Sequence, residues 1–110
     1  MLDALAIIAI VERGKADHIV NKAKEAGALG ATIFHGRGTG EKEAQKLLHI
    51  RVESSKETIV ILAKTDDYKA IFNEMVAAGN LKAPGTGIIF TVKVSDLVGL
   101  HQRDDHVFDP

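Results

Sequence analysis

Two apolar runs decide the fold, Ile7-Ile8-Ala9-Ile10-Val11 and, 52 positions further along the chain, Ile59-Val60-Ile61-Leu62-Ala63. Each run leads into a helical pattern that stops at a glycine, and each half continues through further glycines into a second apolar run. The offset needs no gap, because Gly27 of the first half falls on Gly79 of the second. A strand–helix–strand unit used twice predicts an α+β, ferredoxin-like βαββαβ fold, with a four-stranded antiparallel sheet and two helices on one face.

Local patterns place the elements within each half. In chain order, we expect a strand at residues 5–11, a helix over 15–27, strands at 31–35 and 57–63, a helix over 65–79 and a strand at 88–94. Apolar residues at helical spacing form the buried stripes Ala16, Ile19, Val20, Ala23 and Tyr68, Ile71, Phe72, Met75. Thr65-Asp66-Asp67 supplies a capping side chain for the second helix, and Ser95-Asp96 is expected to start a short helical turn through Leu97. Residues 48–53 alternate between apolar and polar, which predicts a half-exposed strand paired with residues 57–63.

The strands are apolar at consecutive positions, as in Ile7 with Ile8 or Ile88 through Phe90. Both faces of the sheet therefore favour burial, but two helices can cover only one face. The expected solution is an oligomer in which the open faces pack together.

Composition narrows the class of protein. The 110 residues suit one domain, which we place at residues 1–101, followed by a polar tail at 102–110. A net charge of −1 without a run of Lys or Arg gives no electrostatic basis for nucleic-acid binding. The chain has no cysteine, which excludes disulfides and thiolate metal sites. No signal-peptide pattern or membrane-length apolar stretch is present, so we expect a cytosolic protein.

Two glycine segments occupy equivalent places in the two halves. Gly36-Arg37-Gly38-Thr39-Gly40 follows a strand, and Gly85-Thr86-Gly87 precedes one, shortly after Lys82. Glycines let the main chain turn its N–H groups toward an anion, and Arg37 adds a fork suited to phosphate or carboxylate oxygens. Neither segment is a Walker loop or a Rossmann fingerprint. Two tight loops that serve only the fold remain the alternative reading.

The order of these features resembles the P-II signal-transduction family over about residues 5 to 101. The resemblance is carried by the duplicated halves, by Arg37-Gly38-Thr39-Gly40 before a long loop, by Pro84-Gly85-Thr86-Gly87-Ile88-Ile89-Phe90 and by Val94-Ser95-Asp96-Leu97-Val98-Gly99-Leu100. It implies a homotrimer whose open sheet faces line the centre, with ATP or ADP bound in clefts between subunits. It also implies a partner-binding T-loop, here at about residues 40–56, that regulates a membrane transporter or a metabolic enzyme, one such role being in nitrogen metabolism.

Residue by residue, the resemblance implies a nucleotide site formed by Arg37, Gly38, Thr39, Gly40, Val60, Ile61, Leu62, Gly85, Thr86, Gly87 and His101. The partner-binding loop would carry Glu41, Lys42, Glu43 and Lys46. The chain departs from the family pattern at Ile88, where members carry a lysine, and at Gly99, where they carry an arginine. The loop contains no tyrosine, since Tyr68 lies on the second helix, so tyrosine nucleotidylation in the loop is excluded.

The sequence gives no support for catalysis. Acylphosphatases share the expected fold and use a loop arginine with a helix asparagine, for which Arg37 and Asn21 are formally available. That chemistry, however, needs a phosphate cradle between the first strand and the first helix, where Glu12-Arg13-Gly14-Lys15 is too short and too poor in glycine. No nucleophile–base pair is apparent.

A metal-responsive or purely structural trimer on the same fold remains the alternative function. His35 and His49 have no ligand spacing that links them. His101, Asp104, Asp105 and His106 form a denser cluster that a divalent cation could reach, although an acidic tail explains it more simply. We therefore assign no metal ligands.

Overall fold

The computed structural model describes residues 3–36 and 55–99, and it has the predicted βαββαβ order. The elements are β1 (Leu5–Glu12), α1 (Ala16–Glu25), β2 (Thr32–Gly36), β3 (Lys56–Ala63), α3 (Tyr68–Gly79) and β4 (Gly87–Lys93). The predicted strand at residues 48–53 lies outside the described residues.

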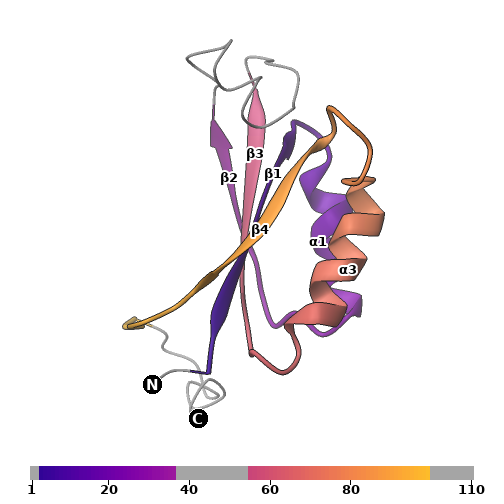
Figure 1. The fold of residues 1–110 in the computed structure, drawn as a ribbon. Helices are drawn as coiled ribbons and strands as arrows, with labels where there is room; N and C mark the ends of the chain where they lie inside the picture. The colour runs from indigo at the N-terminus through magenta and orange to yellow at the C-terminus, as the bar shows by residue number, and fades with distance from the viewer. Residues whose placement is uncertain (1–2, 37–54, 100–110) are drawn as a thin grey trace.

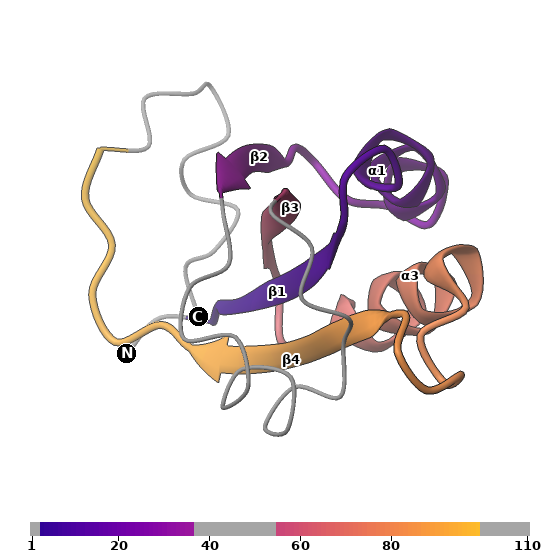
Figure 2. The ribbon, with the colours of Figure 1, turned by 90° about the horizontal axis from the view of Figure 1, so that it is seen from above.

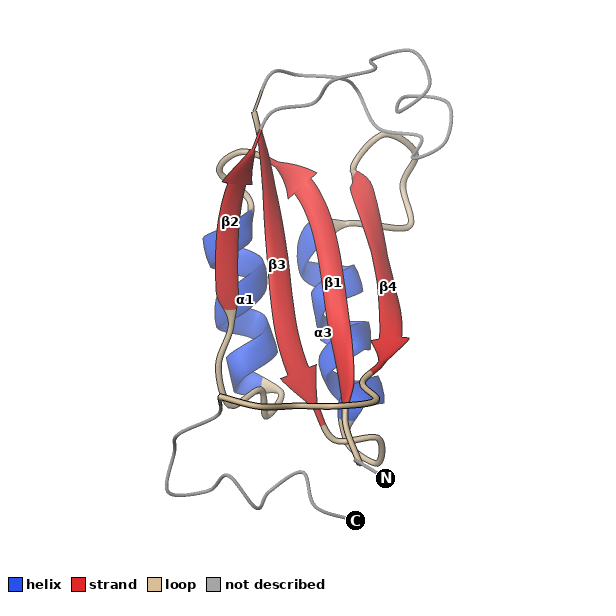
Figure 3. Ribbon diagram, turned by 90° about the vertical axis from the view of Figure 1, so that its left-hand side faces the viewer, coloured by secondary structure: helices blue, strands red, loops and turns tan. Residues whose placement is uncertain are grey.

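The four strands form one antiparallel sheet in the order β2-β3-β1-β4, and both helices lie on the same face of it (Figures 1 and 3). β1 is central because it pairs with β3 along one edge and with β4 along the other. Seen from above, α1 lies on the side of β2 and β3, and α3 on the side of β4 (Figure 2). This arrangement confirms the predicted four-stranded sheet with two helices.

Alternate residues of the central strands face the helices and form the core. The fully buried side chains include Ile7 and Val11 from β1, and Ile59 and Ile61 from β3. The four stripe residues predicted for α1 are all buried. On α3, Ile71 and Met75 are buried, whereas Tyr68 and Phe72 pack against the core only in part.

The other face of the sheet carries apolar side chains without a helix over it. These residues alternate with the core positions and are Ala6, Ile8, Ile10, Phe34, Val60, Leu62, Ile88, Phe90 and Val92. Phe34 is 55% exposed, Phe90 38% and Val92 46%. The expectation that both faces favour burial is therefore met in this single chain, and the open face is the one toward the viewer in Figure 3.

Two local predictions were wrong, one about the cap of α3 and one about a helical turn after β4. The N-cap of α3 is Asp67, whose side chain makes no capping hydrogen bond, because its backbone (φ −109°, ψ −12°) is helical and not extended as a capping residue requires. Residues 95–97 form no helical turn. The N–H of Val94 donates to the carbonyl of Ala4 (3.3 Å), which keeps the chain extended beside the start of β1.

Gly79 serves packing more than helix termination. It is the last residue of α3, and Asn80 adopts the left-handed conformation that ends the helix (φ 53°, ψ 42°). A Cβ on Gly79 would lie 3.0 Å from Cδ1 of Ile19 on α1. The glycine therefore lets the two helices approach each other closely.

Gly87 has no room for a side chain. Its φ is +138°, and a Cβ there would lie 2.5 Å from the carbonyl oxygen of Ile10. We expect Gly87→Ala to lower the free energy of unfolding by about 2 to 4 kcal/mol, because overpacking and a left-handed φ each cost about 1 to 3 kcal/mol. Urea denaturation measures the change. Gly30→Ala is the matched control, since nothing lies within 4 Å of its Cβ, and an equal loss in both variants would refute the steric explanation.

Candidate functional site

The two glycine segments begin at the same end of the sheet. His35 pairs with Glu57, Glu57 with Val11, and Val11 with Gly87, so one row of residues crosses all four strands there. Gly36 on β2 and Gly87 on β4 thus lie on opposite edges of that end, roughly 14 Å apart at ordinary strand spacing. Arg37, Gly38, Thr39 and Gly40 lie outside the described residues, as do the loop residues Glu41, Lys42, Glu43 and Lys46.

The second glycine segment is a tight turn held by its own threonine. Gly85 and Gly87 both have positive φ values (+79° and +138°). The Thr86 hydroxyl lies 2.9 Å from the carbonyl of Asn80 and 2.8 Å from that of Ala83, and it is the donor toward both. A hydroxyl has one hydrogen, which these two carbonyls share, so the Thr86 hydroxyl is used within its own loop and stabilises it.

The stabilising role of the Thr86 hydroxyl can be tested by substitution. Thr86→Val removes the donor and leaves two loop carbonyls to water, so the free energy of unfolding should fall by about 1 kcal/mol. Thr86→Ser keeps the hydroxyl and is expected to stay close to the wild type. Urea denaturation compares the two, and equal stability of Thr86→Val and wild type would contradict the role given to the hydroxyl.

The predicted adenine-facing segment at Val60, Ile61 and Leu62 lies further down β3. The Ile61 side chain is fully buried beneath the helices, whereas Val60 and Leu62 belong to the open face. Leu62 borders a cavity of about 110 Å³ at the lower end of the sheet, whose other lining residues are Gly27, Leu29, Ala63, Lys64, Asp67 and Ile71. Leu62 pairs with Ala6, five positions from the Val11–Gly87 pair, or roughly 17 Å along the strand. The cavity at Leu62 and the glycine turn are therefore separate regions of the single chain.

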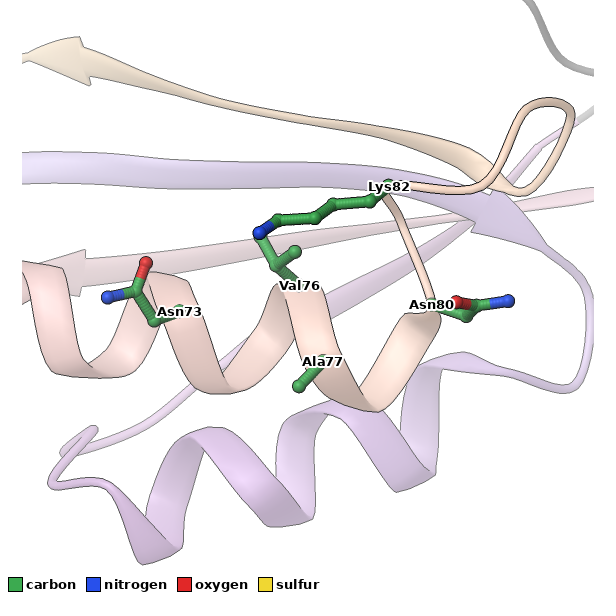
Figure 4. Close-up of a pocket in the computed structure, with 5 residues that line it drawn as sticks. All are labelled: Asn73, Val76, Ala77, Asn80 and Lys82. Atoms are coloured by element: carbon green, nitrogen blue, oxygen red, sulfur yellow. The ribbon is translucent and has the colours of Figure 1, made fainter.

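A larger open cavity of about 360 Å³ lies on the outer side of α3 and is lined by Asn73, Val76, Ala77, Asn80 and Lys82 (Figure 4). The Lys82 side chain runs back along the helix, and its ammonium group ends above Val76. Two amides and one cation form its polar lining. This cavity is linked to the glycine turn through Asn80, whose carbonyl accepts a hydrogen bond from the Thr86 hydroxyl.

Glu57 is the residue that the sequence analysis missed. Its carboxylate is nearly buried, and Oε1 accepts hydrogen bonds from the main-chain N–H groups of Gly14 (2.8 Å) and Ala16 (3.0 Å). Its other oxygen, Oε2, lies 3.4 Å from Nδ1 of His35. The signal in the sequence was an acid at the start of an otherwise apolar strand, but nothing local indicates its partners 41 and 43 positions away.

The described residues contain neither a cluster suited to a metal ion nor a membrane-spanning helix. Within residues 3–36 and 55–99, no group of three or more His, Cys, Asp or Glu side chains is placed to hold a metal ion. His49, His101, Asp104, Asp105 and His106 lie outside those ranges. In the same part of the chain, no helix has both the length and the hydropathy needed to cross a membrane.

Comparison with known proteins decides the family. The model of the family described as "Nitrogen regulatory protein P-II" matches residues 4–104. The chain belongs to this family. P-II proteins are signal-transduction regulators without enzymatic activity, so both the predicted resemblance and the rejection of catalysis are confirmed.

A solved structure supports the fold. The crystal structure of Arabidopsis thaliana PII bound to citrate is similar to this P-II protein with a TM-score of 0.68 and 22% sequence identity, covering 89% of this chain and 83% of that chain. At this identity the likeness shows the shared fold. No protein with a curated description matches the chain.

Proposed function

We propose that this P-II protein is a cytosolic homotrimer that binds an adenine nucleotide, ATP or ADP, in clefts between its subunits. The segment at about residues 40–56 then regulates a membrane transporter or a metabolic enzyme, in nitrogen metabolism or a related pathway. The observation that carries the proposal is the open sheet face, which is apolar and exposed in the single chain while regions suited to a nucleotide lie at its two ends.

The open face supports the trimer. Ile8 pairs with Val60 on one side and with Phe90 on the other, so apolar side chains cross three strands at the middle of the sheet. Phe34 and Val92 extend the apolar surface to the outer strands. An exposed surface of this kind marks an interface, and identical chains that use it in a closed ring leave no apolar edge uncovered.

The separation of the two regions supports a site between subunits. The Gly85-Thr86-Gly87 turn suits phosphate oxygens, and the small apolar cavity at Leu62 suits one edge of a base. In a trimer, the Gly85-Thr86-Gly87 turn of one subunit can lie beside the cavity at Leu62 of its neighbour. Arg37, Gly38, Thr39, Gly40 and His101 would complete the site.

Two cationic side chains of the family pattern are missing, and this lowers the nucleotide affinity that we expect. Ile88 stands at the start of β4, where the family has a lysine, and Gly99 replaces an arginine. Phosphate binding would then depend on main-chain N–H groups and on Arg37, and we expect weaker affinity than a site with three cations gives. The ligand can also be another small anion, and citrate belongs in the test because the Arabidopsis protein is described as bound to it.

A thermal-shift panel tests the function. ATP, ADP, AMP, cyclic AMP, citrate and divalent cations are each added to the full-length protein, because a ligand that binds only the native state raises the melting temperature. We expect ATP or ADP to stabilise the protein. Stabilisation by metal ions alone, lost on truncation after Leu100, would instead identify the metal-responsive alternative.

Arg37→Ala is expected to weaken nucleotide binding by roughly 10- to 100-fold, the usual contribution of a hydrogen bond to a charged group. Isothermal titration calorimetry measures the dissociation constant, and light scattering checks that assembly is unchanged. Lys24→Ala removes the same charge from the exposed side of α1 and is the control. Equal affinity of the two variants would remove Arg37 from the site.

Ile8→Lys tests the trimer. It places a charge at the centre of the open face, so we expect the protein to elute at about 11.8 kDa in place of three times that mass. Light scattering after size exclusion measures the mass, and circular dichroism checks that the chain stays folded. Ala77→Lys, on the outer side of α3, is the control and should remain trimeric. A wild-type protein that is a folded monomer would contradict the proposal directly.

A further inference from the structure

Glu57 joins three segments that are distant in the sequence. Oε1 holds the β1–α1 turn through the N–H groups of Gly14 and Ala16, and Oε2 faces the imidazole of His35 on β2. The Glu57 side chain is 10% exposed and that of His35 is 70% exposed. A nearly buried carboxylate with both oxygens engaged has little freedom to move without losing a contact.

Glu57 belongs to the row of paired residues that connects the end of β2 with the second glycine turn. The row His35–Glu57–Val11–Gly87 runs from the last residues of β2 to the second glycine turn. Val11 is fully buried between Glu57 and Gly87. Glu57 therefore lies between the β1–α1 turn, which it contacts through Oε1, and the end of β2, which it faces through Oε2.

The carboxylate also stabilises the first turn of α1. The N-cap residue Lys15 makes no side-chain capping hydrogen bond, and the carboxylate from β3 accepts from the N–H of Ala16, the first helical residue. A negative charge at this terminus is favoured by the helix dipole. The start of α1 thus depends on a residue of β3 that is itself in contact with β2.

We propose that Glu57 and His35 are positioning residues that couple the end of β2 to the β1–α1 turn. The proposal concerns the regulation of the nucleotide site proposed above and rests on that function. A ligand that displaces the end of β2 changes the contact of His35 with Glu57. Glu57 passes the change to Gly14 and Ala16 at the start of α1, so the end of β2 and the β1–α1 turn respond together.

Residue-resolved hydrogen exchange of the full-length protein tests the coupling without any ligand. His35→Ala removes a largely exposed ring that lies beside Oε2 of Glu57, whereas the Gly14 and Ala16 amides donate to Oε1. We nevertheless expect both amides to exchange about three to ten times faster. His35→Asn should restore slow exchange, because its amide nitrogen occupies nearly the same place as the imidazole Nδ1. His18→Ala, an exposed histidine on α1, is the matched control.

Glu57→Gln gives a second measurement. It keeps the shape of the side chain but removes the charge, and we expect the same two amides to exchange about five to ten times faster. Unchanged exchange at Gly14 and Ala16 in His35→Ala overturns the coupling, as does a loss of protection spread evenly over the whole sheet. Failure of Glu57→Gln to fold leaves the His35 variants to decide.

Adding ATP separates this inference from the proposed function. We expect saturating ATP to slow exchange at Gly14 and Ala16 in the wild type, and His35→Ala to reduce that effect while ATP still protects Gly87. Absence of any response to ATP in the wild type would refute nucleotide binding, and the ligand-free comparison would still decide the coupling. An ATP effect of equal size in wild type and His35→Ala would refute the coupling alone.

Discussion

The pairing of β1 with both β3 and β4 is the constraint on which the rest of the structure depends. Because β1 lies between them, its register determines which residues of the two halves share a row. The row through Val11 brings Gly87 and Glu57 to the same end of the sheet as the last residues of β2. A one-residue slip would exchange the core face for the open face on a paired strand and would separate these groups.

The same alternation produces the surface on which the proposed assembly depends. One set of residues on β1 and β3 is buried under α1 and α3, and the other set is apolar along the middle and lower part of the sheet, from Ala6 to Ile10 on β1 and at Val60 and Leu62 on β3. A monomeric sheet would carry polar residues on its open face. The proposed assembly would bury this apolar face, and it would make the ends of the sheet the places where subunits share a ligand.

Three of the described side chains at this end of the sheet are engaged within the protein or carry no charge. The Thr86 hydroxyl is used within its own loop, and Ile88 offers no charge. The buried Glu57 carboxylate is occupied by Gly14, Ala16 and His35. The glycine turn is held by hydrogen bonds within its own loop.

The sequence alone determined the repeated strand–helix–strand order, the buried stripe of α1 and the apolar character of both sheet faces. These properties follow from hydrophobic periodicity and glycine placement, which are local and can be read within a short window. Local signals failed at the start of α3 and at residues 95–97, where backbone conformation and a hydrogen bond to Ala4 prevailed over side-chain preference.

Only the tertiary structure decided how Glu57 is used, that Gly79 serves helix packing, and that Leu62 and Gly87 lie at opposite ends of the sheet. Each of these depends on strand register or helix approach between residues distant in the chain. No propensity or motif encodes such a contact, because its free energy arises only when the two halves pack against each other.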